Sequence, residues 1–366
     1  MPDIRLDGIT KRFGDFTAVK DLNVTFEENT VTCLLGPSGC GKTTLMRMIA
    51  GLETPTEGRV RFGERDVTAL APRQRNIGMV FQYPVMYPTL TVEENILLPL
   101  RHDRTVDQSE RRRRLAEVLE VLQMEDMAGA TIGQLDAGSR QRVAVGRAVA
   151  RYCDIILFDE PTTNVEVNAK LQLIRAFKEV ARRLRQTIIY VTHDQTEAMT
   201  LADHIALMRD GEIVQHAPPP ELYRQCRTEF GGWFIGNPGM NFYRTELHAD
   251  RTNVRLPFLA REIPVPEGAR GDLTVGIRPE HVRLHDSDHG GLAAAEVISR
   301  SITIGGQYLV KLAVDDQIIR AKVPSSVGRR LGGRVYLECP DWAVTVFSGG
   351  VRLETGTAAE QSVSSR

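Results

Sequence analysis

The segment 36–43, which reads GPSGCGKT, constrains the fold of this 366-residue chain more than any other. It has the spacing G-x-x-x-x-G-K-[ST] and lies between the apolar run VTCLLG and the helix-forming run KTTLMRMIAGL. Glycines at this spacing let backbone amides turn inward around phosphate oxygens, and the helix that follows offers its positive N-terminus. The pattern predicts a strand, a phosphate-binding loop and a helix. A glycine turn without a ligand is the alternative.

The nucleotide contacts are expected from this loop and from the start of its helix. Lys42 would reach the β- and γ-phosphates of ATP, and the Thr43 hydroxyl would bind Mg²⁺. The residues predicted to bind ATP are Gly36, Pro37, Ser38, Gly39, Cys40, Gly41, Lys42, Thr43 and Thr44.

A second apolar run, IILFDEP, ends in the acids Asp159 and Glu160. Ligands bind at the carboxyl edge of open α/β sheets, which is where a parallel strand ends. We expect Asp159 to hold Mg²⁺ and Glu160 to accept a proton from the attacking water. A strand end exposed to solvent is the alternative, which is less favoured beside a phosphate-binding loop.

Two further polar residues follow strand-like runs. His193 ends the run QTIIYVTHD, and Gln82 ends MVFQ. A single histidine is usually structural, but here we expect His193 beside Glu160, in contact with the γ-phosphate. Gln82 would ligate Mg²⁺ and orient water. The predicted catalytic residues are Glu160, His193, Gln82 and Lys42, and the predicted metal ligands are Thr43, Gln82 and Asp159.

The order of the predicted elements indicates two domains. Strands and helices alternate through residues 1–236, which predicts a parallel α/β sheet, with a mainly helical subdomain at about 84–152. Residues 237–366 contain short β-like runs such as LTVGI, YLVKLAV and AVTVF, which predict a small all-β, barrel-like domain. The polar tail TGTAAEQSVSSR is expected to be frayed.

Composition argues against several classes of protein. The net charge of −1 gives no basis for general nucleic-acid binding, and the run ERRRRL at 110–115 is expected to be a solvated helix face. The charged N-terminus and the lack of a long apolar run predict neither a signal peptide nor a membrane span. Five scattered cysteines fit a reducing cytosol rather than disulfides or a zinc site; they are Cys33, Cys40, Cys153, Cys226 and Cys339.

Together these motifs resemble the ATP-binding subunit of an ABC transporter, over roughly residues 4–241. The resemblance rests on GPSGCGKTT, MVFQ, RQRVAVGRAVAR, IILFDEP and YVTHDQTEAM, in the family's order. It implies a P-loop NTPase with a RecA-like core, ATP and Mg²⁺ as cofactors, and adenine stacked on Phe13. The segments GEIVQHAPPPELY, FIGNPGMN and VGIRPEHVRL resemble the subgroup that energises uptake of sugars, polyols and glycerol phosphate, which carries a C-terminal, OB-like regulatory domain.

The resemblance also implies partners. Two ATPase subunits would pair head to tail, with each ATP between one subunit's phosphate-binding loop and the other's signature motif. Two membrane permease subunits would dock near Gln82 to Glu94, although ordinary packing between subdomains explains those residues equally well. A periplasmic solute-binding protein and a regulator of the β-domain are further implied partners. The chain would then be a peripheral protein at the cytoplasmic face of the bacterial inner membrane.

The segment LDAGS, from Leu135 to Ser139, aligns with the family's signature but differs from it at three of five positions. In the family, a serine hydroxyl and glycine amides point at the partner's γ-phosphate. Asp136 stands where that serine is usual, and aspartate is a strong helix N-cap that would occupy the amides and repel phosphate. We therefore expect the half-site formed in trans by Asp136, Gly138 and Ser139 to bind or hydrolyse ATP poorly. Alternatively, Asp136 turns aside and Gly138 and Ser139 suffice.

The loop after Glu160, TTNVEVNAK, also departs from the family and has two extra residues before the helix. Both altered motifs belong to the dimer interface, whereas Lys42, Asp159, Glu160 and His193 are intact. We expect an asymmetric heterodimer with a second ATPase, like the paired ATPases of glycerol-type uptake systems. The alternatives are a homodimeric sugar-importer ATPase and, less favoured, a non-transport ABC ATPase.

Overall fold

The structure is a computed structural model, and it divides into two compact units, Met1–Leu222 and Tyr223–Arg366. It describes residues 2–83, 85–101, 103, 105–151, 153–163, 165–245, 253–256, 262–265, 269, 272–288, 290, 292–303 and 305–353. The C-terminal tail at 355–366, which was predicted to be frayed, lies outside the described residues, as do Pro84 and Tyr152 at the limits of the predicted helical subdomain.

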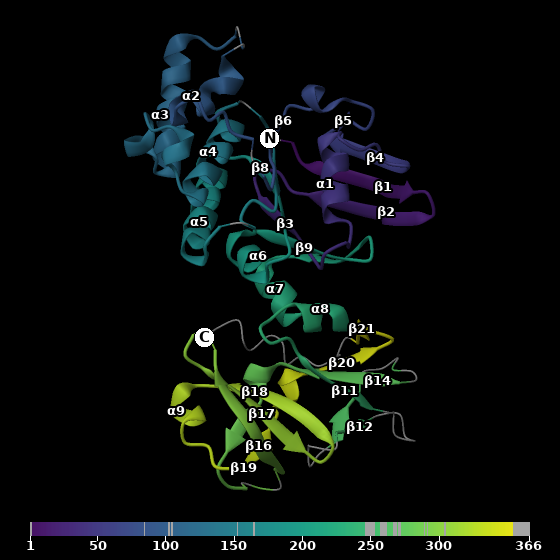
Figure 1. The fold of residues 1–366 in the computed structure, drawn as a ribbon. Helices are drawn as coiled ribbons and strands as arrows, with labels where there is room; N and C mark the ends of the chain where they lie inside the picture. The colour runs from purple at the N-terminus through teal and green to yellow at the C-terminus, as the bar shows by residue number, and fades with distance from the viewer. Residues whose placement is uncertain are drawn as a thin grey trace. The chain divides into compact units, whose positions relative to one another are not determined.

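A six-stranded sheet forms the centre of the first unit (Figure 1). Its strands are β3 (Val31–Leu35), β6 (Ile77–Val80), β7 (Ile155–Asp159), β8 (Thr187–Thr192), β9 (His204–Arg209) and β10 (Glu212–Ala217). They lie in the order β10-β9-β3-β8-β7-β6, and all neighbours are parallel except β10 and β9. The predicted parallel α/β sheet is confirmed, and β3, β7 and β8 end at the same edge.

Helices pack on both faces of this sheet, because its strands alternate their apolar side chains between the faces. On one face, Leu157 and Ile189 share a core with α1 (Lys42–Ala50) and with an antiparallel sheet, which contacts α1 from the far side. On the other face, Phe158 packs against Phe177 of α5 (Val167–Leu184), with the ring centroids 5.0 Å apart. The antiparallel sheet comprises β1 (Ile4–Phe13), β2 (Phe16–Phe26), β4 (Glu57–Phe62) and β5 (Arg65–Asp66).

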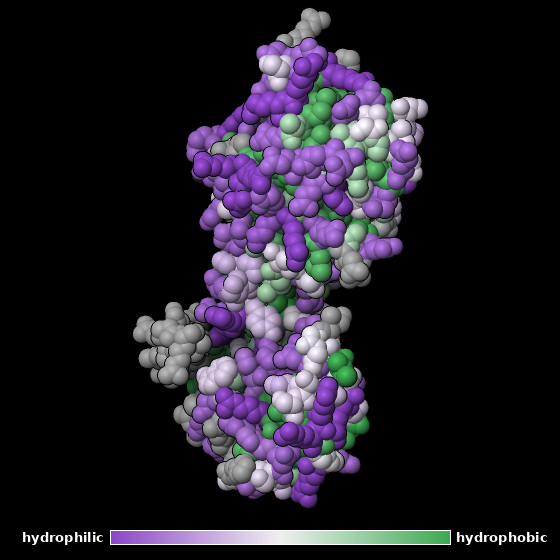
Figure 2. All heavy atoms as spheres, turned by 90° about the vertical axis from the view of Figure 1, so that its left-hand side faces the viewer, coloured by the Kyte–Doolittle hydropathy of each residue, from purple (hydrophilic) through white to green (hydrophobic). Residues whose placement is uncertain are grey.

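The segment between β6 and β7 is mainly helical. Its helices are α2 (Val92–Leu97), α3 (Gln108–Leu122) and α4 (Ala137–Ala150). Charged side chains cover the exposed side of α3, and Figure 2, which views the side of the first unit that carries α3, shows mainly hydrophilic side chains there. Arg114 departs from the predicted solvated face. The approach of α4 buries it, and its guanidinium donates to the Val149 carbonyl of α4 at 3.0 Å and to Glu117 at 3.2 Å.

After β8, the chain forms the short helix α6 (Gln195–Leu201), then β9 and β10, and then α7 (Pro219–Arg224), in which the first unit ends and the second begins. The boundary predicted from the sequence, after residue 236, falls inside the second unit. The reason is that α8 (Glu229–Phe234) is bonded within that unit: Glu229 N donates to Gly350 O at 2.9 Å, and Met240 N donates to Gly232 O at 3.0 Å.

The described strands of the second unit form two antiparallel sheets and a two-stranded ribbon that share one core. The first sheet has the order β11 (Asn241–Thr245), β14 (Leu273–Ile277), β20 (Val344–Ser348) and β21 (Val351–Arg352). The second has the order β15 (Arg283–His285), β19 (Arg334–Glu338), β16 (Ala293–Ile302), β17 (Tyr308–Val314) and β18 (Gln317–Val323). The ribbon is β12 (Asn253–Arg255) and β13 (Glu262–Pro264), and α9 (Ser325–Gly328) follows β18. The predicted all-β character is confirmed.

A buried arginine holds the start of the second unit to its strands. The Arg278 guanidinium donates to Ile235 O and to Tyr223 O, both at 2.6 Å, and lies 3.8 Å from the centroid of the Tyr223 ring. Arg278 is among the largest fully buried side chains of the described residues. The segment VGIRPEHVRL, which resembles the importer subgroup, therefore contains a buried arginine with a structural role.

Candidate active site

The glycine-rich loop connects β3 to α1 and lies against β9. Gly41 caps α1 in the left-handed conformation, with φ of 103°, and a residue with a side chain would be strained in this conformation. A Cβ atom built on Gly36 would lie 2.3 Å from the backbone oxygen of Met208, so the loop approaches β9 too closely for any other residue. The backbone conformation of Gly41 and the close contact at Gly36 explain why the loop needs glycine at both positions.

Lys42 is buried beneath this loop, with 5% of its surface exposed. Its ammonium donates to the carbonyl oxygens of Gly36 at 2.9 Å and Pro37 at 2.8 Å. Cys40 Sγ lies 3.8 Å from the Lys42 Nζ. Burial raises the pKa of the Cys40 thiol despite the nearby positive charge, which keeps the thiol protonated and weakly nucleophilic.

Asp159 lies at the end of β7, across from the start of α1. The Thr43 hydroxyl donates to Asp159 Oδ1 at 3.4 Å. Burial, and then the charge of Glu160, raise the pKa of Asp159. A hydroxyl and a carboxylate are oxygen ligands of the kind that Mg²⁺ prefers, so this pair fits the predicted metal site. Gln82 lies two residues beyond β6, at the same edge, since Val80 pairs with Phe158 of β7.

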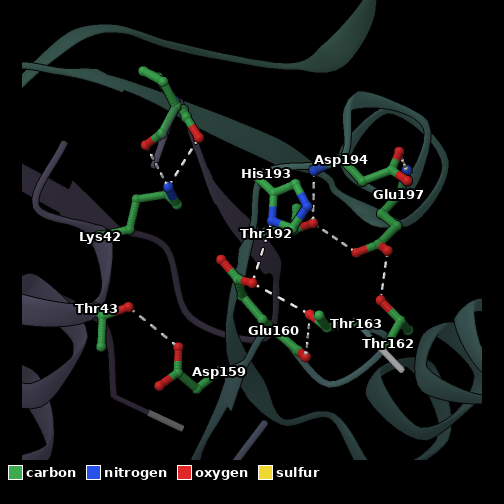
Figure 3. A network of polar contacts seen from close by, with 12 residues as sticks. Lys42, Thr43, Asp159, Glu160, Thr162, Thr163, Thr192, His193, Asp194 and Glu197 are labelled. Atoms are coloured by element: carbon green, nitrogen blue, oxygen red, sulfur yellow. Dashed lines mark hydrogen bonds and ion pairs between the residues drawn. The ribbon is translucent and has the colours of Figure 1, made fainter. Parts of the chain in front are cut away.

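Glu160 and His193 lie side by side, as predicted from the order of their strands (Figure 3). The distance from His193 Nδ1 to Glu160 Oε2 is 3.2 Å. Glu160 has a left-handed backbone, with φ of 44°, and its amide donates to Val191 O of the neighbouring strand at 3.1 Å. The Thr163 hydroxyl also donates to Glu160 Oε2, at 3.2 Å. This arrangement leaves the carboxylate 22% exposed, so that it can accept a proton from water.

Behind this pair lies a buried carboxylate that the motifs did not reveal. Glu197 of α6 is 2% exposed, and its two oxygens accept from four side chains. The donors are Thr162 at 2.5 Å, Lys170 at 2.5 Å, Tyr190 at 3.0 Å and Thr192 at 2.7 Å. The motif YVTHDQTEAM contains Glu197, but nothing in its spacing predicts that this acid is buried and binds four donors.

The predicted trans residues lie at the start of α4. Asp136 is the N-cap of that helix, and its Oδ1 accepts from the Ser139 amide at 2.6 Å, as expected for aspartate at this position. This hydrogen bond lowers the pKa of Asp136. Gly138 faces Asp136 and the first turn of α5: a Cβ built on Gly138 would lie 3.4 Å from Asp136 Oδ1 and 3.3 Å from Ala169 Cβ.

Phe13, the predicted adenine contact, ends β1 and is 47% exposed. The Lys11 ammonium lies 4.8 Å from the centroid of its ring. An exposed aromatic face beside a cation suits stacking on a flat base next to phosphate groups. The structure thus leaves Phe13 available for the predicted contact.

Comparisons with known proteins agree with this geometry. The family model described as "ABC transporter" matches residues 19–163, and the "TOBE domain" model matches residues 275–347. The sulfoquinovosyl glycerol transport ATP-binding protein SmoE of Agrobacterium fabrum is 38% identical, over 88% of this chain and 91% of the relative. The sn-glycerol-3-phosphate import ATP-binding protein UgpC of Ruegeria pomeroyi is 40% identical, over 80% and 81%.

Solved structures match 59% of this chain. The dimeric structure of MJ0796, a bacterial ABC transporter cassette, is 31% identical with a TM-score of 0.52, and the match covers 59% of this chain and 98% of that one. A dimeric post-hydrolysis state of the same cassette, bound to ADP and Pi, matches with a TM-score of 0.51 at 30% identity, over 59% and 98% of the two chains. The chain belongs to the ABC transporter family, as an ATP-binding and ATP-hydrolysing subunit with a C-terminal TOBE domain.

Proposed function

We propose that this chain powers the uptake of a sugar, polyol or glycerol-type solute by hydrolysing ATP at the sheet edge described above. The observation that carries the catalytic part is the Glu160–His193 pair, 3.2 Å apart, beside the loop that holds Lys42. The solute class is supported by the names of the relatives, which include transport proteins for sulfoquinovosyl glycerol, sn-glycerol-3-phosphate and trehalose.

Each residue has a chemical role in this proposal. Lys42 and the loop amides bind the β- and γ-phosphates, and Phe13 stacks on the adenine. Thr43, Asp159 and Gln82 would hold Mg²⁺, which neutralises charge on the phosphates. Glu160 accepts the proton of the attacking water, and His193 contacts the γ-phosphate.

The permease subunits are proposed to bind the segment after β6. This segment exposes four large apolar side chains close together in sequence: Phe81 at 48%, Tyr83 at 70%, Val85 at 69% and Tyr87 at 47%. A cluster of exposed aromatic residues favours a protein partner. Among the described residues, no helix has both the length and the hydropathy that a membrane span requires. Attachment to the cytoplasmic face of the membrane would therefore come through these partner subunits.

We also propose that this chain pairs with a second, different ATPase. The support is the hydrogen bond from the Ser139 amide to Asp136, because it occupies a donor that the signature helix would offer to a partner's ATP. Ser139 itself is 1% exposed. The half-site built on LDAGS would then hydrolyse ATP slowly, while this chain's own loop faces the signature of its partner.

The catalytic assignment is tested with Glu160→Gln, which keeps the shape of the side chain and removes its basicity. We expect the ATPase rate to fall about 10²- to 10⁴-fold with ATP binding retained, as for loss of a general base. Glu221→Gln is the matched control, since Glu221 is exposed on α7 and lies outside the site. An ATPase rate in Glu160→Gln as high as that in Glu221→Gln would refute the role of Glu160.

The pairing is tested separately. The transporter is purified through a tag on this chain in mild detergent, and every subunit is identified by mass. A second ATPase is the expected result. A complex with this ATPase alone would contain two LDAGS half-sites, and the asymmetric model would then be wrong.

A further inference from the structure

The Glu197 carboxylate joins three parts of the chain that border the active site. Oε1 accepts from Thr162, which lies two residues after Glu160, and from Lys170 of α5. Oε2 accepts from Tyr190 and Thr192, both on β8. Because the carboxylate is buried, each donor satisfies a charge that water cannot reach, so all four side chains are held firmly.

The network holds both neighbours of His193 in the chain (Figure 3). The Thr192 hydroxyl donates to Glu197 and accepts from the Asp194 amide at 3.0 Å. The Asp194 carboxylate caps α6 through the amide of Thr196 at 2.7 Å, and it binds Lys170 at 2.7 Å. The chain on both sides of His193 is therefore held by hydrogen bonds and an ion pair, although the His193 side chain itself is 53% exposed.

The same network holds both ends of the segment 163–169. Thr162 precedes this segment and Lys170 follows it, and both bind Glu197 Oε1 at 2.5 Å. The segment also reaches the catalytic carboxylate directly, through the Thr163 hydroxyl. A displacement of the segment therefore acts on Glu160 through Thr163 and on His193 through Glu197.

We propose that Glu197 is a positioning residue that holds His193 against Glu160 and couples that pair to the segment 163–169. The inference rests on the proposed catalytic roles of Glu160 and His193. The proposal predicts that removing the contact of Thr162 or Lys170 with Glu197 slows hydrolysis. ATP binding should stay unchanged, because the loop around Lys42 belongs to other elements.

The test uses the assembled transporter and the variant Thr162→Val, which keeps the shape of the side chain and removes one donor to Glu197. We expect kcat to fall about tenfold with the KM for ATP unchanged, since small misplacements of reacting groups cost rates of this order or more. Thr162→Ser restores the hydroxyl and should restore kcat. The control is Lys178→Met, because Lys178 also links α5 to α6, through Thr200 O at 3.3 Å, but lies outside the network.

Three results would overturn the proposal: an unchanged kcat in Thr162→Val, a loss that serine does not restore, or an equal loss in Lys178→Met. If Thr162→Val does not assemble, Lys170→Met tests the other end of the segment, since the Lys170 side chain is 21% exposed and tolerates replacement better. An unchanged kcat in that variant is equally decisive. Failure of the catalytic assignment is distinguishable, because it would show as an active Glu160→Gln.

Discussion

Replacing Asp136 with asparagine should strengthen the binding of ATP at the LDAGS half-site. Asparagine caps helices as well as aspartate does, so the variant removes a charge and keeps the cap. Asp136 Oδ1 lies 2.6 Å from the Ser139 nitrogen. A phosphate oxygen bound to the same amide would lie about 2.9 Å from that nitrogen, so the two anions would be at most about 5.5 Å apart.

The size of the repulsion follows from this separation. At about 5.5 Å, two unit charges repel by about 3 kcal/mol at an effective dielectric constant of about 20, and by about 0.8 kcal/mol in water. Asp136 is exposed, so solvent screening places the value between these limits. The dissociation constant for ATP at the LDAGS half-site should therefore fall by about four- to 150-fold in Asp136→Asn, and the difference should shrink in high salt.

The assay titrates the binding of ATP to the assembled transporter and compares Asp136→Asn with Asp126→Asn, which removes another exposed acid that precedes the signature segment. An unchanged or higher dissociation constant at the LDAGS half-site in Asp136→Asn would refute the electrostatic reasoning. Asp136→Ala, in contrast, removes the cap and should lower the free energy of unfolding by about 1 kcal/mol at neutral pH. The pKa of Asp136 is lowered in the folded chain. The difference in the free energy of unfolding between the wild type and Asp136→Ala is therefore fully present above the pKa that Asp136 has in the unfolded chain. It is lost as the pH falls through the lower pKa of the folded chain.

Three further predictions concern the loop and the second unit. Alkylation of Cys40 should be slow at neutral pH and should accelerate only above the pH at which a free thiol reacts, because burial raises the pKa of this thiol. Bound ATP should protect Cys40 from alkylation. Labelling at the same rate with and without ATP would contradict the place of Cys40 in the loop. Gly36→Ala should abolish ATP binding, because the added Cβ would lie 2.3 Å from Met208 O. Gly39 has φ of 80° but open space around it, so Gly39→Ala should lower the free energy of unfolding, measured in urea, by only about 1–2 kcal/mol. Arg278→Met should destabilise the second unit by about 3 kcal/mol or more, since it leaves the carbonyls of Ile235 and Tyr223 without their buried donor; a loss below about 1 kcal/mol would show that water replaces it.

The sequence was sufficient for those parts of the site that local spacing determines. The loop before Lys42 and the acids after β7 each lie within one continuous segment, and the parallel order of β7 and β8 then brings Glu160 to His193. Glycine spacing and apolar strands specify such features without knowledge of the rest of the chain.

The remaining features depend on contacts between distant segments. Glu197 gathers donors from a loop, a helix and a strand, and none of these residues is unusual in its own segment. Arg114 lies within a charged run, yet the approach of α4 buries it. Likewise, residues 229–234 fall within the domain predicted over 1–236, although the hydrogen bonds of α8 belong to the second unit. Three-dimensional packing, which no local pattern encodes, determines each of these outcomes.

The left-handed backbone of Glu160 has an evolutionary consequence. A non-glycine residue in this conformation costs of order 1 kcal/mol or more, which glycine would recover and asparagine would partly recover. Selection for stability alone would therefore remove the carboxylate from this position, and only selection for turnover retains it. Duplicated copies of such a subunit that are freed from hydrolysis should drift toward glycine or asparagine at this residue and melt at higher temperature than their active parents.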